Sequence, residues 1–513
     1  MRGGTLLLAL ALVAGAGHVA PVWAQDDEEE RVDPKRERAF EDHAAAVEAS
    51  DANGAADALV ALLDDPARAA WHGEALIMLA DHVNALGLVH ASLGFTLAAL
   101  QTDTEGDNIS LKIAVNRSLS MADSTGDMLW VEDVLAGNVG LALLGSEKGR
   151  LAYLGAKGNY RAGNYAATIA ATSLINAKSD PAWYGRGQQL KGVVMAQQGS
   201  FQGAVAPLLT AQAAVGDDAD ALDLINLNLA RVYYATENYA RAIEYAAKIR
   251  RESPLWPQAQ FERAWAHFML QDMNGVVGIL QTHTTPYFDS WYFPEAFLLR
   301  TYGLFLLCKF PEASRQIDAF QAQYQPVHDE LRAGLAGMDD AGAFAAVAAD
   351  RRGEQAAVPG RLLAPYRNDE TFAGAERAVA SLASDISSLG NFSQHAWGQH
   401  ALALLTERRD ALIAEQGARV RTRLEAQALD LQTMLNDTEI TKLDMLRLER
   451  KLYEQASLTG QLEDARALAQ RKPRIRKGQR YWPYDGEIWA DELGYYRANV
   501  KAECPAGLAT GNR

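Results

Sequence analysis

Cysteine is scarce in this chain of 513 residues, with Cys308 and Cys504 the two present. No clustered CxxC pair exists to bind zinc. No HExxH, GxSxG or GxxxxGK segment marks a metalloprotease, a serine hydrolase or a nucleotide-phosphate site. His395 and His400 are five residues apart, a poor spacing for two metal ligands on one helical face. We therefore expect no catalytic centre, no cofactor and no metal.

The two cysteines leave two interpretations open. In an oxidising compartment Cys308 and Cys504 can form a disulfide that ties the C-terminal tail to the middle of the chain. Alternatively, Cys308 is a buried thiol within an apolar helix and Cys504 is an exposed one. Because the sequence does not give the distance between the two thiols, the disulfide is a hypothesis.

Positive charge and long apolar runs are also in short supply. The chain has 49 Lys and Arg against 65 Asp and Glu, a formal net charge of −16. Since binding to nucleic acid needs net or clustered positive charge, we expect no nucleic-acid partner. The acidic balance instead favours a basic protein or peptide. No later segment has 18 consecutive apolar residues, so we expect no transmembrane segment in the mature chain.

The first 24 residues have the pattern of a cleaved signal peptide. Arg2 supplies the positive charge, and the apolar run from Thr5 to Ala16 is too short to span a bilayer. Val22-Trp23-Ala24 places small residues where a signal peptidase cleaves, although an uncleaved anchor is the alternative. The pattern and the Ala-rich composition look bacterial, so we expect a periplasmic or secreted protein.

A short motif recurs through the middle of the chain. The gaps between its aromatic positions are 36, 38 and 71 residues, and a degenerate copy around Asp272-Met273-Asn274 fits the long gap. A fixed period of this size predicts stacked helix pairs that bury each other's apolar faces. We expect the aromatic residues to pack in the core. The four copies are Gly163-Asn164-Tyr165, Gly199-Ser200-Phe201, Glu237-Asn238-Tyr239 and Cys308-Lys309-Phe310.

The unit from Leu224 to Pro254 resembles a tetratricopeptide repeat. Leu229, Ala230 and Tyr233 share one face of a first helix, Ala242 opens a second helix, and Pro254 ends the unit. Small residues are needed where two helices approach closely. The resemblance implies helix-turn-helix stacking, a concave groove and a protein or peptide partner. Neighbouring units match less well: Thr168 and Val277 stand at the small position, while Ala204 and Ala313 keep it, and Pro326 ends the last unit one place late.

A long helical region follows the repeats. No Gly or Pro lies between Gly417 and Gly460, and leucines such as Leu424, Leu431 and Leu435 have heptad-like spacing. The pattern breaks at Asn436-Asp437, so either one long helix carries a phase change or a second helix is capped there. A coiled-coil-like contact in this region allows a homo-oligomer.

The C-terminal tail combines a basic run with a cluster of aromatic residues. The basic run either binds an anionic partner or neutralises acids of this acidic chain. The aromatic residues either form a contact site or dock on the chain's own long helices, and we favour docking. The candidate partner-binding residues are Arg471, Lys472, Arg474, Arg476, Lys477, Trp482, Tyr484 and Trp489.

The predicted fold class is all-α: a TPR-like α-solenoid followed by a long-helix, coiled-coil-like region and an aromatic tail. The segments expected are a signal peptide at 1–24, a disordered charged linker at 25–38, diverged helical repeats of unfixed phase at 39–150, TPR-like repeats at 151–326, an irregular linker at 327–370, the long helical region at 371–470 and the tail at 471–513.

Two functions remain open from the sequence. The first is a non-catalytic exported scaffold that mediates protein–protein interactions in the bacterial cell envelope through a TPR-like concave surface. The alternative is a cell-wall carbohydrate-binding or hydrolytic protein that uses the aromatic residues of the tail with Asp485, Glu487, Asp491 and Glu492.

Overall fold

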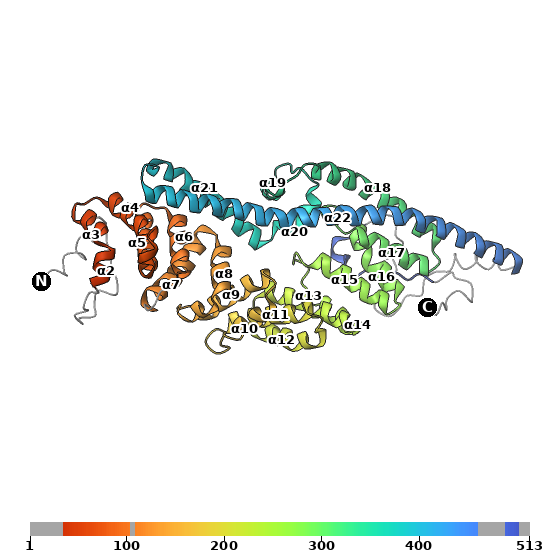
Figure 1. Ribbon diagram of the computed structural model, residues 1–513. Coiled ribbons are helices and arrows are strands. Elements are labelled where there is room, and N and C mark those ends of the chain that lie inside the picture. The colour runs from red at the N-terminus through yellow and green to blue at the C-terminus, as the bar shows by residue number, and fades with distance from the viewer. Residues whose placement is uncertain (1–33, 103–107, 460–487, 502–513) are drawn as a thin grey trace. The chain divides into compact units, whose positions relative to one another are not determined.

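The computed structural model describes residues 34–102, 108–459 and 488–501, and this part of the chain contains helices and no strand (Figure 1). The fold class is the predicted one, an all-α solenoid of helix pairs. None of the described helices is long and apolar enough to cross a membrane. The chain divides into two compact units, 1–194 with 370–416 and 195–369 with 417–513.

The first unit consists of the N-terminal helices together with α21 and the start of α22. Its main apolar core runs from α5 to α11 and includes Leu93, Leu135 and Leu151. Its elements are α2 (Pro34–Ala39), α3 (Glu41–Glu48), α4 (Ala52–Leu63), η2 (Pro66–Trp71), α5 (His72–Ala85), α6 (Val89–Leu100), α7 (Asn108–Thr125), α8 (Met128–Gly137), η3 (Val139–Leu143), α9 (Lys148–Arg161), α10 (Tyr165–Thr172), α11 (Pro181–Gln197), α21 (Glu370–Leu389), η6 (Gly390–Phe392) and the first part of α22 (Ala396–Thr459).

The second unit contains the clearest repeats and most of α22. From α12 to α18 each helix packs against the next in sequence, as stacked helix pairs require. Its elements are α12 (Phe201–Ala214), α13 (Ala219–Ala235), α14 (Tyr239–Ala246), α15 (Trp256–Met269), α16 (Met273–Leu280), η4 (Thr282–Thr284), η5 (Pro286–Phe288), α17 (Pro294–Leu306), α18 (Phe310–Leu335), α19 (Asp340–Arg351), α20 (Gly360–Arg367) and η7 (Ala490–Glu492).

The recurring motif forms the turn between the two helices of a pair. Its first residue has positive φ, as in Gly163 (73°) and Glu237 (60°), and ends the first helix in the left-handed conformation. The next N–H donates to the carbonyl five residues back: Asn238 to Tyr233 at 2.8 Å. The Asn238 side chain then accepts from the N–H of Arg241 and caps the second helix. One three-residue motif thus ends one helix and begins the next.

The same turn extends the repeat into the N-terminal region, where the sequence alone did not fix the phase. Ser50 and Gly87 have positive φ, and the following residues, Asp51 and Leu88, donate to carbonyls five residues back at 3.0 Å. Gly126 has the same conformation immediately before α8. Successive turns at 50, 87, 126, 163, 199, 237, 271 and 308 lie 34 to 39 residues apart.

The small residues three places after the aromatic position of the motif lie in the core, whereas the aromatic residues themselves are buried to different degrees. Ala204 and Ala313 are 0% exposed, and Thr168, which replaces Ala, is 0% exposed as well. Phe310 is buried, but Phe201 is 39% exposed. The expectation that these aromatic residues pack in the core is confirmed in part, since Phe310 belongs to one core cluster and Tyr239 packs against another, whereas Phe201 is exposed. In three repeats the ring after the turn packs on the end of the preceding helix. The pairs are Tyr160–Tyr165, Tyr234–Tyr239 and Phe305–Phe310.

In the first unit, α21 and the start of α22 pack on the N-terminal helices (Figure 1). Trp397 is 0% exposed and its ring lies 4.7 Å from that of His82 on α5. Asp57 on α4 accepts from the backbone N–H of Trp397 and lies 3.0 Å from His395 Nδ1. His395 thus has a carboxylate partner beside the N-terminus of α22.

Several expected boundaries differ from the observed helices. Helix α18 continues through Pro326 to Leu335, since Val327 and Leu331 are buried, and α19 and α20 follow within the expected linker. Helix α22 begins at Ala396 and continues through Asn436-Asp437, so no second helix is capped there. Residues 371–416 of the expected long helical region belong to the first unit.

The C-terminal part of the expected charged linker is helical. Helix α2 begins at Pro34, and Arg36 Nε donates to both carboxylate oxygens of Glu74 at 3.0 and 3.1 Å. Proline is well suited to the first turn of a helix because its missing N–H needs no partner there. The remaining residues of that linker, 25–33, lie outside the described residues, as does the predicted signal peptide.

Candidate functional site

The predicted tail residues fall mostly outside the described part of the chain. Cys308 is disulfide-bonded, whereas Cys504, the other cysteine of the sequence, lies outside the described residues, so the pairing of these two stays a prediction. Cys308 itself is half-buried at a left-handed turn (φ 56°), which differs from the expected thiol inside an apolar helix. Trp489 is described and is 53% exposed. The others outside the described residues are Arg471, Lys472, Arg474, Arg476, Lys477, Trp482 and Tyr484.

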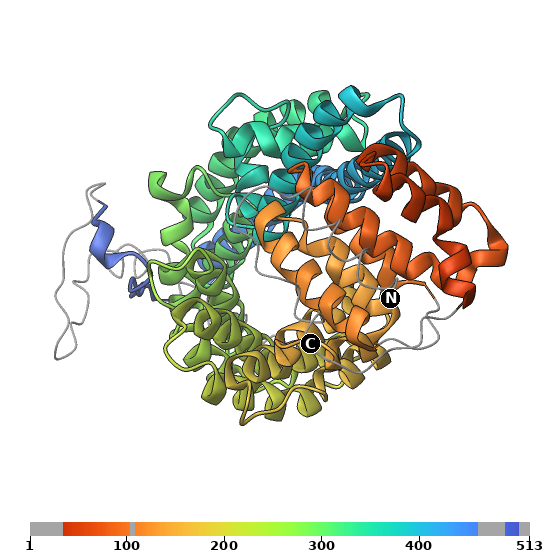
Figure 2. The same ribbon diagram turned by 90° about the vertical axis from the view of Figure 1, so that its left-hand side faces the viewer.

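The described piece of the tail, residues 488–501, is called the strap, and it docks on the helical repeats of the second unit. Leu493 is 4% exposed and packs with Trp256 and Ala259 of α15. Further along, Ala498 and Val500 pack on a cluster that includes residues of α16, α17, α18 and α22. The described piece of the tail therefore packs on α15 and α16 of the repeats and on a cluster to which the long helix α22 also contributes Met445. Figure 2 shows η7 of the strap in blue beside green helices of this unit.

A tight turn in the strap places its backbone against α15. Leu493 (φ −57°, ψ 133°) and Gly494 (φ 84°) are the central residues of a type II turn, closed by the Tyr495 N–H donating to the Glu492 carbonyl at 3.0 Å. The Gly494 N–H donates to Thr282 Oγ1 at 2.8 Å. A Cβ atom on Gly494 would lie 2.4 Å from the Trp256 ring, so both the backbone conformation and the available space require glycine.

Asn274 on α16 binds the strap backbone from both sides. Its Nδ2 donates to the Val500 carbonyl at 3.1 Å, and its Oδ1 accepts from the Val500 N–H at 2.8 Å. The Asn274 backbone carbonyl also accepts from the Ala498 N–H at 3.2 Å. Since these bonds use main-chain groups of the strap, they depend little on the identity of its side chains.

Gly278 on α16 permits this close approach. A Cβ atom there would lie 2.5 Å from the Tyr496 carbonyl oxygen, 2.6 Å from the Arg497 Cα and 2.7 Å from the Ala498 nitrogen. All three neighbours are backbone atoms, which cannot turn away as a side chain can. The strap therefore passes directly over Gly278.

Charged groups fix the two ends of the strap. Arg251 Nη1 donates to the Asp491 carbonyl at 2.8 Å, and Arg497 Nη2 pairs with Asp272 at 3.1 Å. Asp272 also caps α16 and lies 3.1 Å from His267 Nδ1. Burial and the nearby Arg263 lower the pKa of His267. We call Trp256, Asp272, Asn274, Gly278 and Thr282 the strap site.

The acidic residues of the alternative function do not form a comparable site. Asp491 and Glu492 are exposed neighbours on η7, and Asp491 contributes its backbone carbonyl to the contact with Arg251. Asp485 and Glu487 lie outside the described residues. Nothing in the described part of the tail brings two carboxylates together across a cleft.

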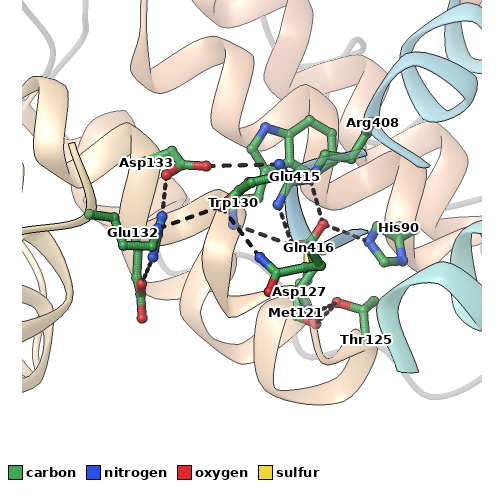
Figure 3. Close-up of polar contacts among 11 residues, drawn as sticks. His90, Met121, Thr125, Asp127, Trp130, Glu132, Asp133, Arg408, Glu415 and Gln416 are labelled. Atoms are coloured by element: carbon green, nitrogen blue, oxygen red, sulfur yellow. Dashed lines mark hydrogen bonds and ion pairs between the residues drawn. The ribbon is translucent and has the colours of Figure 1, made fainter. Parts of the chain in front are cut away.

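The first unit contains a buried polar cluster that the sequence did not reveal (Figure 3). Asp127 is 0% exposed in its side chain and accepts from Arg408 through both oxygens, at 2.9 Å from Nε and 2.6 Å from Nη2. His90 Nε2 lies 3.3 Å from Asp127 on the other side. Burial by itself would raise the pKa of Asp127, but the bonds from Arg408 and His90 outweigh it and lower the pKa to about 2.

This cluster has the residue types of a nucleophile, a base and an acid. His90 Nδ1 lies 3.0 Å from Ser381 Oγ, while its other nitrogen faces Asp127. A catalytic triad needs an exposed nucleophile and a carboxylate free to orient the base. Here the side chains of His90 and Asp127 are 0% exposed, and Asp127 is bound by Arg408. The cluster therefore links α6, α8, α21 and α22 through buried hydrogen bonds and an ion pair.

A second group of charges lies next to the buried polar cluster. Glu132 has a side chain that is 1% exposed and pairs with Lys157 at 2.7 Å and with Arg161. Arg161 also pairs with Asp133, and Arg408 Nη1 lies 3.8 Å from Asp133. The two groups together join α8, α9 and the start of α22 within this unit. The sequence did not predict the buried polar cluster because Asp127 and Arg408 are 281 residues apart.

Comparisons with known proteins give little further information. No family model matches the chain, and no curated protein matches it. A solved structure of Naa15/Naa10 bound to HypK-THB matches 80% of this chain and 68% of that chain, with 13% identity and a TM-score of 0.32. A likeness this distant supports no argument about function, so the proposals below rest on the residues described above.

Proposed function

We propose that this protein is a non-catalytic exported scaffold that mediates protein–protein interactions in the bacterial cell envelope. Its helical repeats bind extended segments of polypeptide. The export signal, Arg2 with the apolar run and Val22-Trp23-Ala24, supports the location. The observation that carries the proposal is the strap, a segment that packs on α15 and whose main chain is bound by Asn274 of α16.

The strap supports a binding role because it uses the features by which helical surfaces hold peptides. Asn274 offers a donor and an acceptor to one main-chain unit, and Gly278 lets the backbone approach. One buried apolar residue, Leu493, anchors the segment, while Trp489 and Tyr495 stay 53% and 75% exposed. The acidic balance of the chain favours a basic partner.

The test is affinity capture from envelope extract of the source cells. The mature full-length protein is compared with a truncation that ends at Gln470 and so lacks the basic run and the strap. Cell fractionation first checks that the protein is found in the envelope, and mass spectrometry of the purified protein checks that it begins at Gln25. A specific partner retained by one or both forms supports the proposal. A full-length protein that stays in the cytoplasm, or that captures no partner in either form, contradicts it.

A further inference from the structure

The strap is bound less completely than the helices on which it lies. Among its residues 488–501, Leu493 and Gly494 are buried, and the others are half-buried or exposed. Its contacts include a turn over Trp256 with a hydrogen bond to Thr282, a crossing over Gly278, and hydrogen bonds to Asn274. They also include an ion pair with Asp272, a hydrogen bond from Arg251, and the half-buried apolar packing of Ala498 and Val500. Segments with few buried apolar contacts open at low free-energy cost while the rest of a protein stays folded.

We propose that the strap site is a peptide-binding site that the strap occupies in cis, so that the strap competes with a segment of another protein. This inference rests on the proposed function and specifies its surface. The competing segment carries the chemistry of the strap: an aliphatic residue, then glycine, then a basic residue three positions after the glycine. In the strap these are Leu493, Gly494 and Arg497.

Each of these three features answers a described group on the repeats. The aliphatic residue fills the apolar cluster around Trp256. Glycine adopts the left-handed backbone conformation of the turn. It also leaves room for the Trp256 ring, which would lie 2.4 Å from an added Cβ atom. The basic residue pairs with Asp272, whose carboxylate is in position as the cap of α16. The basic residue also agrees with the partner expected for an acidic chain.

Occupation in cis has a calculable effect on a partner. A segment tethered to the same chain acts at an effective concentration of roughly millimolar. If the strap alone has a Kd of about 10–100 μM, the tether lowers the apparent affinity for a competing peptide by about 10–100-fold. Release of the strap therefore makes the site available without any rearrangement of α15 or α16.

The experiment uses the full chain and a labelled synthetic peptide of residues 488–501. Gly494→Val releases the strap in cis, because valine is strained at φ 84° and would collide with Trp256. Gly278→Ala closes the strap site to the strap and to the peptide alike. Gly137→Ala, at a helical glycine with no neighbour within 4 Å of an added Cβ, is the matched control. Circular dichroism and the Tm check that every variant is folded.

We expect the peptide to bind the Gly494→Val chain about 10–100-fold more tightly than the wild-type chain. Adding Gly278→Ala to Gly494→Val should abolish this binding, and adding Gly137→Ala should leave it unchanged. Equal binding to all variants, or no binding to a folded Gly494→Val chain, overturns the inference. In that case a partner still captured from envelope extract would leave the proposed function in place and locate it elsewhere on the repeats. A dimer of the Gly494→Val chain that retains no peptide binding also overturns it, since a second copy then covers the site.

Discussion

Gly278→Ala tests the docking of the strap with the smallest change available. The new methyl group would lie 2.5 to 2.7 Å from three backbone atoms of residues 496–498, well inside the usual contact distance of about 3.5–4.0 Å. The strap must move away by about 1 Å or more. Alanine in place of glycine favours the helix itself by about 1 kcal/mol, so α16 should not unfold.

The loss can be estimated from the contacts that depend on close approach. Moving the strap breaks the three hydrogen bonds at Asn274, each worth about 1 kcal/mol. It also withdraws Leu493, whose burial contributes about 2 kcal/mol. A partial loss of about 3 kcal/mol raises the opening equilibrium of the strap by about 100-fold.

Hydrogen exchange measured by mass spectrometry reports this opening directly. The amides of Gly494, Ala498 and Val500 donate to Thr282 and Asn274, so their protection should fall by about 100-fold in Gly278→Ala. Amides of α13 should keep their protection, as should all amides in the Gly137→Ala control. Unchanged exchange in residues 494–500 of the variant would refute the reasoning about Gly278. Loss of protection throughout the second unit would show a folding defect instead.

Three further predictions concern the core. Asp127→Ala should lower the free energy of unfolding, measured in urea, by about 3–5 kcal/mol, because it leaves the buried charge of Arg408 without its main partner. A smaller loss in the double variant with Arg408→Met would confirm this cause. Burial lowers the pKa of His283 from 6.5 to about 4, so between these pH values the unfolded chain binds a proton that the native chain does not. The free energy of unfolding should therefore fall by about 3 kcal/mol as the pH falls from 6.5 to 4, and an equal pH dependence in His283→Asn would contradict this. Ala242→Leu at a helix crossing should cost about 1–3 kcal/mol, whereas Ala240→Leu at an exposed position should cost little, and equal Tm values for the two would refute the role of the small residue.

The repeats could be predicted from the sequence wherever turn and aromatic residue occur together. Gly163, Gly199 and Glu237 take the left-handed conformation, and the aromatic residue two places later made the period visible. At Ser50 and Gly126 the same backbone occurs without the aromatic residue. There the period is encoded by a positive φ and a capping carboxylate, which many unrelated turns share.

The candidate sites depend on contacts that no local pattern encodes. Asn274 and Val500 are 226 residues apart, and Asp127 and Arg408 are 281 apart. Aromatic density predicted that the tail docks, but its docking surface follows from Gly278, an unremarkable glycine within a helix. The start of α22 at Ala396 was not predicted, because its first part is specified by packing on the N-terminal helices, as the burial of Trp397 against His82 illustrates. The roles predicted for the basic run and for the cysteine pair stay predictions.

In our proposal, α15 and α16 bind a segment of another protein when the strap is released. Photo-crosslinking in the source cells tests it most directly, with a crosslinking amino acid in place of Arg251, which contacts the strap at Asp491. In the otherwise wild-type chain the main adduct should join position 251 to the strap. In Gly494→Val the adduct should shift to another protein, and Gly278→Ala should remove that adduct. No intermolecular adduct in Gly494→Val, or one that Gly278→Ala leaves unchanged, would contradict the account.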